Sequence, residues 1–397
     1  MIEDGFLRLR AYCEAENYKG WDPYDGLNSA LFQATDLKEW DLARLALIQL
    51  CKRSPINLRP LLMVPKQHNA KGVGLFLNGY CNLYRLAALG DSRFGTTNEL
   101  QSKIDEVATL LLGLSSKGYS GACWGYNFDW QARRLFLFPA HTPTVVATTF
   151  CASALFSAYE ITRNKQHLDA ALSSAKFVLN DLHRSEHEGG FMLSYSPLPG
   201  NDTVYNASLL GAKLLSYCYH YTGNEEYKTI ARQIVSAACN GQSVDGSWVY
   251  GLLPVQSWID SFHTGYNLDA IAHYARLCDD ESFLENLQCG LNFYLANFFL
   301  DDGTPKYYHD RTYPIDIHCP GQLWVTLSAV GGFHANSALC SKVAAWALVN
   351  MQDPRGYFYY QLKRGVSSKI SYMRWSNAFM FNALSYYLLE TSGKQTG

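Results

Sequence analysis

Two short segments of the sequence gather side chains that can move protons. Residues 258–267 contain Asp260, His263, Tyr266 and Asn267. If a helix begins here, His263, Tyr266 and Asn267 share one face because they are three and four residues apart. Polar groups on a buried face need hydrogen-bond partners, and a site in the interior would supply them. Asp260 is also a natural N-cap for this helix.

Residues 313–322 form the second segment. Asp316 and His318 alternate, so both side chains can point to the same side of an extended stretch, and Pro320 suits the first turn of a following helix. Histidine and aspartate are common general acids and bases in proteins. The candidate catalytic residues are therefore Asp260, His263, Tyr266, Asp316 and His318.

Aromatic residues accompany polar groups in these segments and in three others, 20–29, 124–144 and 372–377. Amphipathic rings stack on sugar faces while their OH or NH groups donate hydrogen bonds, and arginine binds carboxylates through two parallel bonds. A capped turn explains Asp22 and Asp25 equally well. The candidate binding residues are Trp21, Asp22, Asp25, Trp124, Asp129, Trp130, His141, Trp258, Asn267, Gln322, Arg374 and Trp375.

Two cationic segments have two interpretations each. Residues 66–71 form a polar run, ending at Lys71, just before a buried helix; it could hold an anionic group such as a carboxylate, or be a solvated loop. Arg133 and Arg134 could bind a uronate or simply carry surface charge.

A repeat organises the elements that carry these residues. The polar turns at 159–164, 219–224 and 274–279 resemble one another, and each separates an apolar run from an amphipathic one. Buried helices are expected to begin near Lys71, Thr142, Val204, His263, Pro320 and Trp375. Amphipathic helices are expected to begin near Asp36, Asn98, His167, Glu225, Ser282 and Ser337.

Six such hairpins predict an all-α fold, an (α/α)6 barrel that occupies residues 1–397 as a single domain. No unusually polar terminal repeat is present, which favours a closed ring over an open solenoid. The long loops open with glycine and aromatic residues, at 190, 246, 303 and 356, where short β-like segments are expected. All these loops lead into inner helices, so they should gather at one end of the barrel, where a site is expected.

Composition narrows the class of partner. The chain has 397 residues, a net charge of −2 and 17% charged residues. Its overall charge therefore provides no electrostatic attraction for nucleic acid or an anionic membrane. Aromatic residues make up 14%. The eleven cysteines lack paired spacing, and no signal segment is visible, so we expect buried free thiols and a cytoplasmic location. No cofactor or resident metal is predicted.

The hairpin pattern resembles the six-hairpin carbohydrate-active superfamily. Its members include glycoside hydrolases, unsaturated glucuronyl hydrolases, N-acylglucosamine 2-epimerases and the toroidal parts of polysaccharide lyases. Residues 20–29, Gly-Trp-Asp-Pro-Tyr-Asp-Gly-Leu-Asn-Ser, also resemble the start of uncharacterised proteins found with bacterial capsule and O-antigen genes. The resemblance implies an oligosaccharide or polysaccharide substrate, and it carries over no catalytic residue.

The favoured hypothesis is an enzyme that cleaves glycosidic bonds in a bacterial surface polysaccharide, with or without uronates, or in its oligosaccharides. Hydrolysis would use Asp260 and Asp316 as the acid and the base or nucleophile. A lyase would use His263 or Tyr266 to remove a proton beside a uronate carboxylate, which Arg374 or a lysine would neutralise.

Three alternatives remain open. A sugar epimerase or isomerase would use His263 and His318 as a pair of bases. A non-catalytic glycan-binding protein would need only the aromatic residues. A zinc enzyme similar to the lanthionine cyclases could use His263, His318, Cys319 and Cys123, although their spacing does not match that family.

Overall fold

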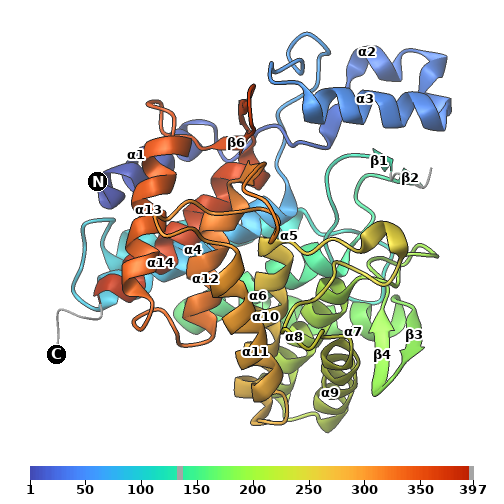
Figure 1. The fold of residues 1–397 in the computed structure, drawn as a ribbon, viewed down its shortest axis with the longest axis vertical. Helices are drawn as coiled ribbons and strands as arrows, with labels where there is room; N and C mark the ends of the chain where they lie inside the picture. The colour runs from blue at the N-terminus through green and yellow to red at the C-terminus, as the bar shows by residue number, and fades with distance from the viewer. Residues whose placement is uncertain (132–136, 393–397) are drawn as a thin grey trace.

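The computed structural model describes residues 1–131 and 137–392, in which six helices form a closed inner ring (Figure 1). Each inner helix packs against the next one, and the last packs against the first. The predicted starts lie within four residues of the observed ones. The inner helices are α4 (Ala70–Ala88), α6 (Val145–Thr162), α8 (Tyr205–Thr222), α10 (Ser261–Cys278), α12 (His318–Ala329) and α14 (Phe379–Ser392).

Outer helices surround the ring, and five of them follow an inner helix along the chain. They are α5 (Thr97–Gly113), α7 (Lys165–Asn180), α9 (Glu225–Asn240), α11 (Leu284–Asn297) and α13 (Ser337–Met351). The sixth outer helix is α1 (Ile2–Ala15), which packs against α13 and α14. The predicted all-α (α/α)6 barrel is confirmed.

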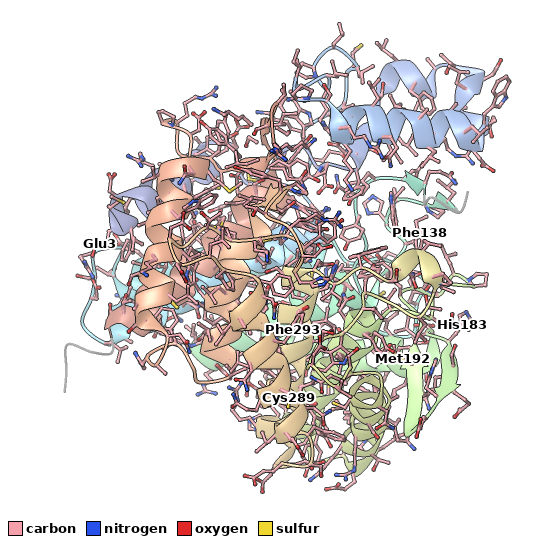
Figure 2. All side chains as sticks on the ribbon, in the orientation of Figure 1. Glu3, Phe138, His183, Met192, Cys289 and Phe293 are labelled. Atoms are coloured by element: carbon pink, nitrogen blue, oxygen red, sulfur yellow. The ribbon has the colours of Figure 1, made fainter. Side chains whose placement is uncertain are left out.

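The turns between inner and outer helices explain the repeat in the sequence. The inner helices α6, α8 and α10 end at residues in the left-handed region, namely Arg163, Gly223 and Asp279. Asn224 then caps α9, because its side chain accepts a hydrogen bond from the backbone of Glu226. The outer helices are amphipathic. On α11, for example, Cys289 is exposed whereas Phe293 is buried (Figure 2).

One expected outer helix is not part of the barrel. The amphipathic pattern after Asp36 gives a short 3-10 turn, Asp36–Glu39, and helix α3 (Asp41–Arg53). With α2 (Ala30–Gln33), helix α3 forms a lobe that stands apart from the ring (Figure 1). Only Ile48 and Cys51 of α3 are buried. The prediction is wrong because the amphipathic pattern does not specify which surface a helix covers, and α1 already occupies the place beside α14.

Short strands form in the long loops. β1 (Trp130–Gln131) pairs with β2 (Leu137–Phe138), and β3 (Arg184–His187) pairs with β4 (Gly190–Leu193), both antiparallel. β5 (Ile315–Asp316), β6 (Tyr359–Leu362) and β7 (Ser368–Ser371) form a three-stranded antiparallel sheet. Among the described residues, the loops at 246 and 303 form isolated bridges rather than strands, such as Val204 with Gly251 and Asp260 with Tyr308.

A glycine in each of these loops lies against the backbone of the next outer helix around the ring. A Cβ on Gly190 would lie 2.1 Å from the carbonyl oxygen of Gln233 in α9, and one on Gly246 would lie 2.3 Å from that of Cys289 in α11. Gly303 approaches Lys342 in α13 in the same way. A Cβ on Gly356, which follows α13, would lie 2.2 Å from the carbonyl oxygen of Arg8 in α1. Helix α1 is therefore the outer helix that this loop meets.

Among the described helices, α6 is long and apolar enough to cross a membrane by length and composition. In the barrel α6 is an inner helix that packs against α4, α5, α7 and α8, and most of it is buried. The burial of α6 among the other barrel helices explains why its sequence is so apolar. All eleven cysteines are free, and ten of them are buried, as predicted.

We predict that Gly356→Ala destabilises the protein more than Gly365→Ala does. Both glycines have positive φ, 105° and 108°, so both variants are strained, at a cost of about 1–3 kcal/mol. Only the Cβ at 356 also meets a backbone carbonyl, in α1, since nothing lies within 4 Å at 365. Urea unfolding of the two variants measures the difference. Equal losses would mean that this contact does not hold α1 in the ring.

Candidate functional site

The loops that lead into the inner helices form a hydrogen-bonded collar at one end of the barrel. Asn69 donates to the side chain of Asn127 across 2.7 Å, and Tyr126 and Tyr195 share a hydrogen bond of 3.1 Å. Further around the ring, the backbone of Ile317 donates to Tyr360. Both predicted acid–base segments lie in this collar, at the N-termini of the neighbouring helices α10 and α12.

Asp260 caps α10 and also holds a histidine. Its Oδ1 accepts a hydrogen bond from the backbone N–H of His263 at 3.1 Å. Its Oδ2 lies 2.7 Å from Nδ1 of His263 and accepts a hydrogen bond from Nε1 of Trp258 at 3.0 Å. The carboxylate has no exposed surface, whereas the His263 side chain is 21% exposed.

Asp316 holds His318 in the same way. Its Oδ1 accepts hydrogen bonds from the backbone N–H of His318 at 3.0 Å and from Nε1 of Trp375 at 2.9 Å, and it lies 3.3 Å from Nδ1 of His318. Its Oδ2 accepts a hydrogen bond from Gln361, the residue that pairs with Asp316 between β5 and β6. The pairing of β5 therefore fixes this carboxylate, which is fully buried.

Each carboxylate fixes one nitrogen of its histidine. When Nδ1 donates to an aspartate, the imidazole is held in the tautomer whose Nε2 carries a lone pair. No hydrogen bond to Nε2 of His263 or His318 is found in the described part of the chain. Burial lowers the pKa of His318 to about 4, against the opposing effect of Asp316. His318 is therefore neutral at pH 7 and can accept a proton.

Both imidazoles contact one ring, that of Phe262. The centroid of the Phe262 ring is 4.1 Å from that of His263 and 5.1 Å from that of His318. The imidazoles cannot be farther apart than these two distances together, a span that one sugar unit can bridge. The ring centroid of Tyr250 lies 4.6 Å from that of His263, and the ring centroid of Trp375 lies 4.4 Å from that of His318.

Tyr266 shares this face of α10 as predicted, and it contacts a lysine across the barrel. Lys71 is the second residue of α4, and its Nζ is 3.4 Å from the hydroxyl of Tyr266. Nζ also lies 4.2 Å from the centroid of the Phe150 ring. Lys71 is 4% exposed and makes no ion pair with a described residue. Burial, with a contribution from nearby Arg374, holds its pKa well below the usual range.

The candidate list omitted Lys71. Its signal in the sequence is that it is the only charged residue of α4 before Arg85, in a helix that is otherwise apolar in its first turns.

Each of the two N-terminal aspartates forms a buried ion pair with an arginine. Arg374 binds Asp22 through two bonds of 2.5 and 2.8 Å. Asp25 contacts Arg59 at 2.5 Å and also accepts a hydrogen bond from the backbone of Asp22. Arg59 donates as well to the hydroxyl of Tyr372. This buried network ties the N-terminal segment to the start of α14, so the structure gives Asp22, Asp25 and Arg374 a structural role, in contrast to the predicted binding role.

The predicted aromatic residues divide into two groups. Trp124 is fully buried and donates to the backbone of Leu111, so its predicted role in binding is wrong. Trp21, Trp130, Trp258 and Trp375 are half-buried and lie in the collar. Trp258 stacks on Tyr250, and Trp130 on Phe138, the labelled side chain below the lobe in Figure 2. Nε1 of Trp21 donates to Val64.

The remaining predicted binding residues are more varied. Asp129 accepts a hydrogen bond from the backbone of Ala140 and so closes its own loop. His141 is exposed, at a turn before α6. Asn267 and Gln322 are buried, and Oδ1 of Asn267 and Oε1 of Gln322 have no hydrogen-bond partner among the described residues. Arg133 and Arg134 lie outside the described residues.

A cavity occupies the centre of the barrel. It has ≈ 60 Å³ of space for the centres of water molecules, room for about four of them. Its walls include Phe150, Tyr266 and Gln322 near the collar and Lys213 and Asp269 deeper in the barrel, which form a buried ion pair of 2.5 Å. Within residues 1–131 and 137–392, no group of three or more His, Cys, Asp or Glu side chains is placed to hold a metal ion.

Solved structures share this architecture. Cellobiose 2-epimerase from Bacillus thermoamylovorans B4167 matches with a TM-score of 0.62 and 13% identity over 83% of this chain and 90% of its own. The (α/α)6-barrel fold is shared. The family 76 α-mannanase BT2949 of Bacteroides thetaiotaomicron matches with a TM-score of 0.60 and 13% identity over 93% and 99%. An unsaturated glucuronyl hydrolase specific for heparin matches with a TM-score of 0.58 and 11% identity over 81% and 86%.

At these identities the comparisons establish the fold alone. The sequence itself matches no family model and no curated protein.

We predict that His318 makes the stability of the protein depend on pH. The unfolded chain takes up a proton near pH 6.5, whereas the folded chain resists it until about pH 4. Protonation therefore favours the unfolded state, and the free energy of unfolding falls as the pH is lowered through this window, by about 3 kcal/mol from this residue. Denaturant unfolding at pH 7 and pH 4.5 should show a smaller loss for His318→Gln. An unchanged loss in that variant would contradict the assignment.

Proposed function

We propose that this protein is a sugar epimerase or isomerase that moves a proton on the carbon beside a carbonyl group. The observation that carries the proposal is the pair of imidazoles, His263 and His318, each held by a buried carboxylate at the entrance of the barrel. Epimerisation needs a base that removes the proton and an acid that returns it to the opposite face. Two histidines beside one ring can share these roles, with neutral His318 removing the proton and His263, when it carries a proton on Nε2, returning one.

The carboxylates are poorly placed for the competing reaction, hydrolysis of a glycosidic bond. Hydrolysis needs two carboxyl groups that reach the substrate. Asp260 and Asp316 lie at the same end of the barrel, but three or more donors bind each of them. Asp22 and Asp25 are bound to arginines. A carboxylate that orients histidine is the role this geometry favours.

A sugar substrate is supported by the aromatic collar and by the comparisons. Half-buried rings such as Trp375 and Trp258 lie next to the histidine pair, where they can stack on a sugar face. Solved proteins with this fold include a cellobiose 2-epimerase and two glycoside hydrolases. We propose reducing oligosaccharides from bacterial surface polysaccharides as substrates, on the resemblance of residues 20–29, and a cytoplasmic location, on the free thiols.

We predict that the protein exchanges the hydrogen beside the carbonyl of a reducing sugar with solvent. Incubation with reducing disaccharides in D₂O should incorporate deuterium at C2, and NMR should detect the epimer or ketose. His263→Gln and His318→Gln should each lower the rate by about 10²- to 10⁴-fold, because each removes one proton carrier. Asp316→Asn should lower it as well, because the amide does not hold the required tautomer.

The matched control is His220→Gln, at an exposed histidine in the last turn of α8, which should retain full exchange. New reducing ends without deuterium at C2 would show hydrolysis instead, and the absorbance of an unsaturated uronate would show a lyase. Sugar binding without any of these products would leave a glycan-binding protein.

A further inference from the structure

Lys71 is a buried amine without the partners that an ammonium group requires. An ammonium has three donors, yet the described residues offer Nζ a single hydrogen bond, of 3.4 Å, to the hydroxyl of Tyr266. The rings of Phe150 and Tyr266 flank it at 4.2 and 5.2 Å. No carboxylate lies within ion-pair distance among these residues. Such surroundings favour a neutral amine, whose lone pair is available for chemistry.

The charged groups around Lys71 act in opposite directions on its pKa, because Arg374 lowers it and Asp22 raises it. Arg374 is the nearest cation and disfavours a second one, while Asp22 is already bound to that arginine through two bonds. Cys151 and Tyr266 are buried, and burial raises the pKa of both, so they are neutral. His318 is neutral as well. Lys71 also lies in the first turn of α4, where the positive end of the helix dipole disfavours an ammonium.

The central cavity borders the two rings that contact this amine, although Lys71 itself is not among the residues that line it. Phe150 and Tyr266, the two rings that contact Nζ, also line the central cavity. Two further groups that line it, Oε1 of Gln322 and Oγ of Ser153, lack hydrogen-bond partners among the described residues. Gln322 is 1% exposed. A hydroxylated two- or three-carbon segment would satisfy these groups and fit a space of about four water molecules.

We propose that Lys71 is a carbonyl-reactive amine, which holds an open-chain hydroxyaldehyde as an imine next to the histidine pair. Nζ forms a bond to the carbonyl carbon, the bond from that carbon to its oxygen breaks, and the oxygen leaves as water with the two amine protons. Addition of water reverses the step and releases the aldehyde. The inference rests on the proposed function for the nature of the substrate, because an imine at C1 would make the neighbouring hydrogen easier for a histidine to remove.

The test is reductive trapping with glycolaldehyde, the smallest hydroxyaldehyde, and sodium cyanoborohydride at pH 7. Peptide mass mapping should find Lys71 alkylated at least ten times faster than exposed lysines such as Lys66. Lys71→Met, which keeps an unbranched side chain that is one atom shorter and suits an apolar pocket, should remove that label and leave the others. Lys71→Arg keeps a cation but cannot form the imine, so it should also lose the label.

Labelling of exposed lysines with Lys71 unmodified, in protein shown by circular dichroism to be folded, would overturn the inference. The experiment separates this inference from the proposed function. A labelled Lys71 in a protein that exchanges no deuterium at C2 supports the amine and defeats the epimerase. Deuterium exchange at the wild-type rate in Lys71→Met, without trapping in the wild type, defeats the amine and leaves the epimerase.

Discussion

The close approach of loop glycines to outer helices is the constraint on which the rest of the molecule depends. Gly190, Gly246, Gly303 and Gly356 each bring a loop against the backbone of the following outer helix, at distances that leave no space for a side chain. The contact therefore sets where each loop leaves the outer layer and enters the ring. Because these four loops are positioned in the same way, the N-termini of the inner helices that follow them meet at one end, and their polar residues face a common space.

This arrangement gives helix caps a second role. Asp260 satisfies backbone groups at the start of α10, which is an ordinary task for an aspartate. Its other oxygen then binds the imidazole that lies one turn ahead. Asp316 acts similarly before α12, with Gln361 and Trp375 as additional donors. The scaffold thus orients the two histidines with groups that the helix ends require in any case, and this leaves few carboxylates free for other chemistry.

The sequence predicts the inner helices well because they are apolar on nearly every side and recur at regular intervals. It could not predict that α1 is the sixth outer helix, since residues 36–53 carry an equally amphipathic pattern. Trp124 and Trp375 are both tryptophans beside polar residues, yet one donates to a core carbonyl and the other to Asp316. The role of Asp316 depends on donors about 45 and 59 residues away, which no local pattern reveals.

The position of α1 as the sixth outer helix has a consequence for how the protein is made. Helix α1 is synthesised before the other described helices, whereas α13 and α14, two of the helices that cover it, are synthesised after the others. Phe6 and Leu9 are fully buried in the finished barrel. Some of the surrounding residues, such as Phe94 beside Phe6, are synthesised early, but others are synthesised much later. Phe6, for example, packs against Phe381. The apolar face of α1 therefore stays partly uncovered until α13 and α14 are synthesised. A chain that ends before these two helices would leave that face exposed.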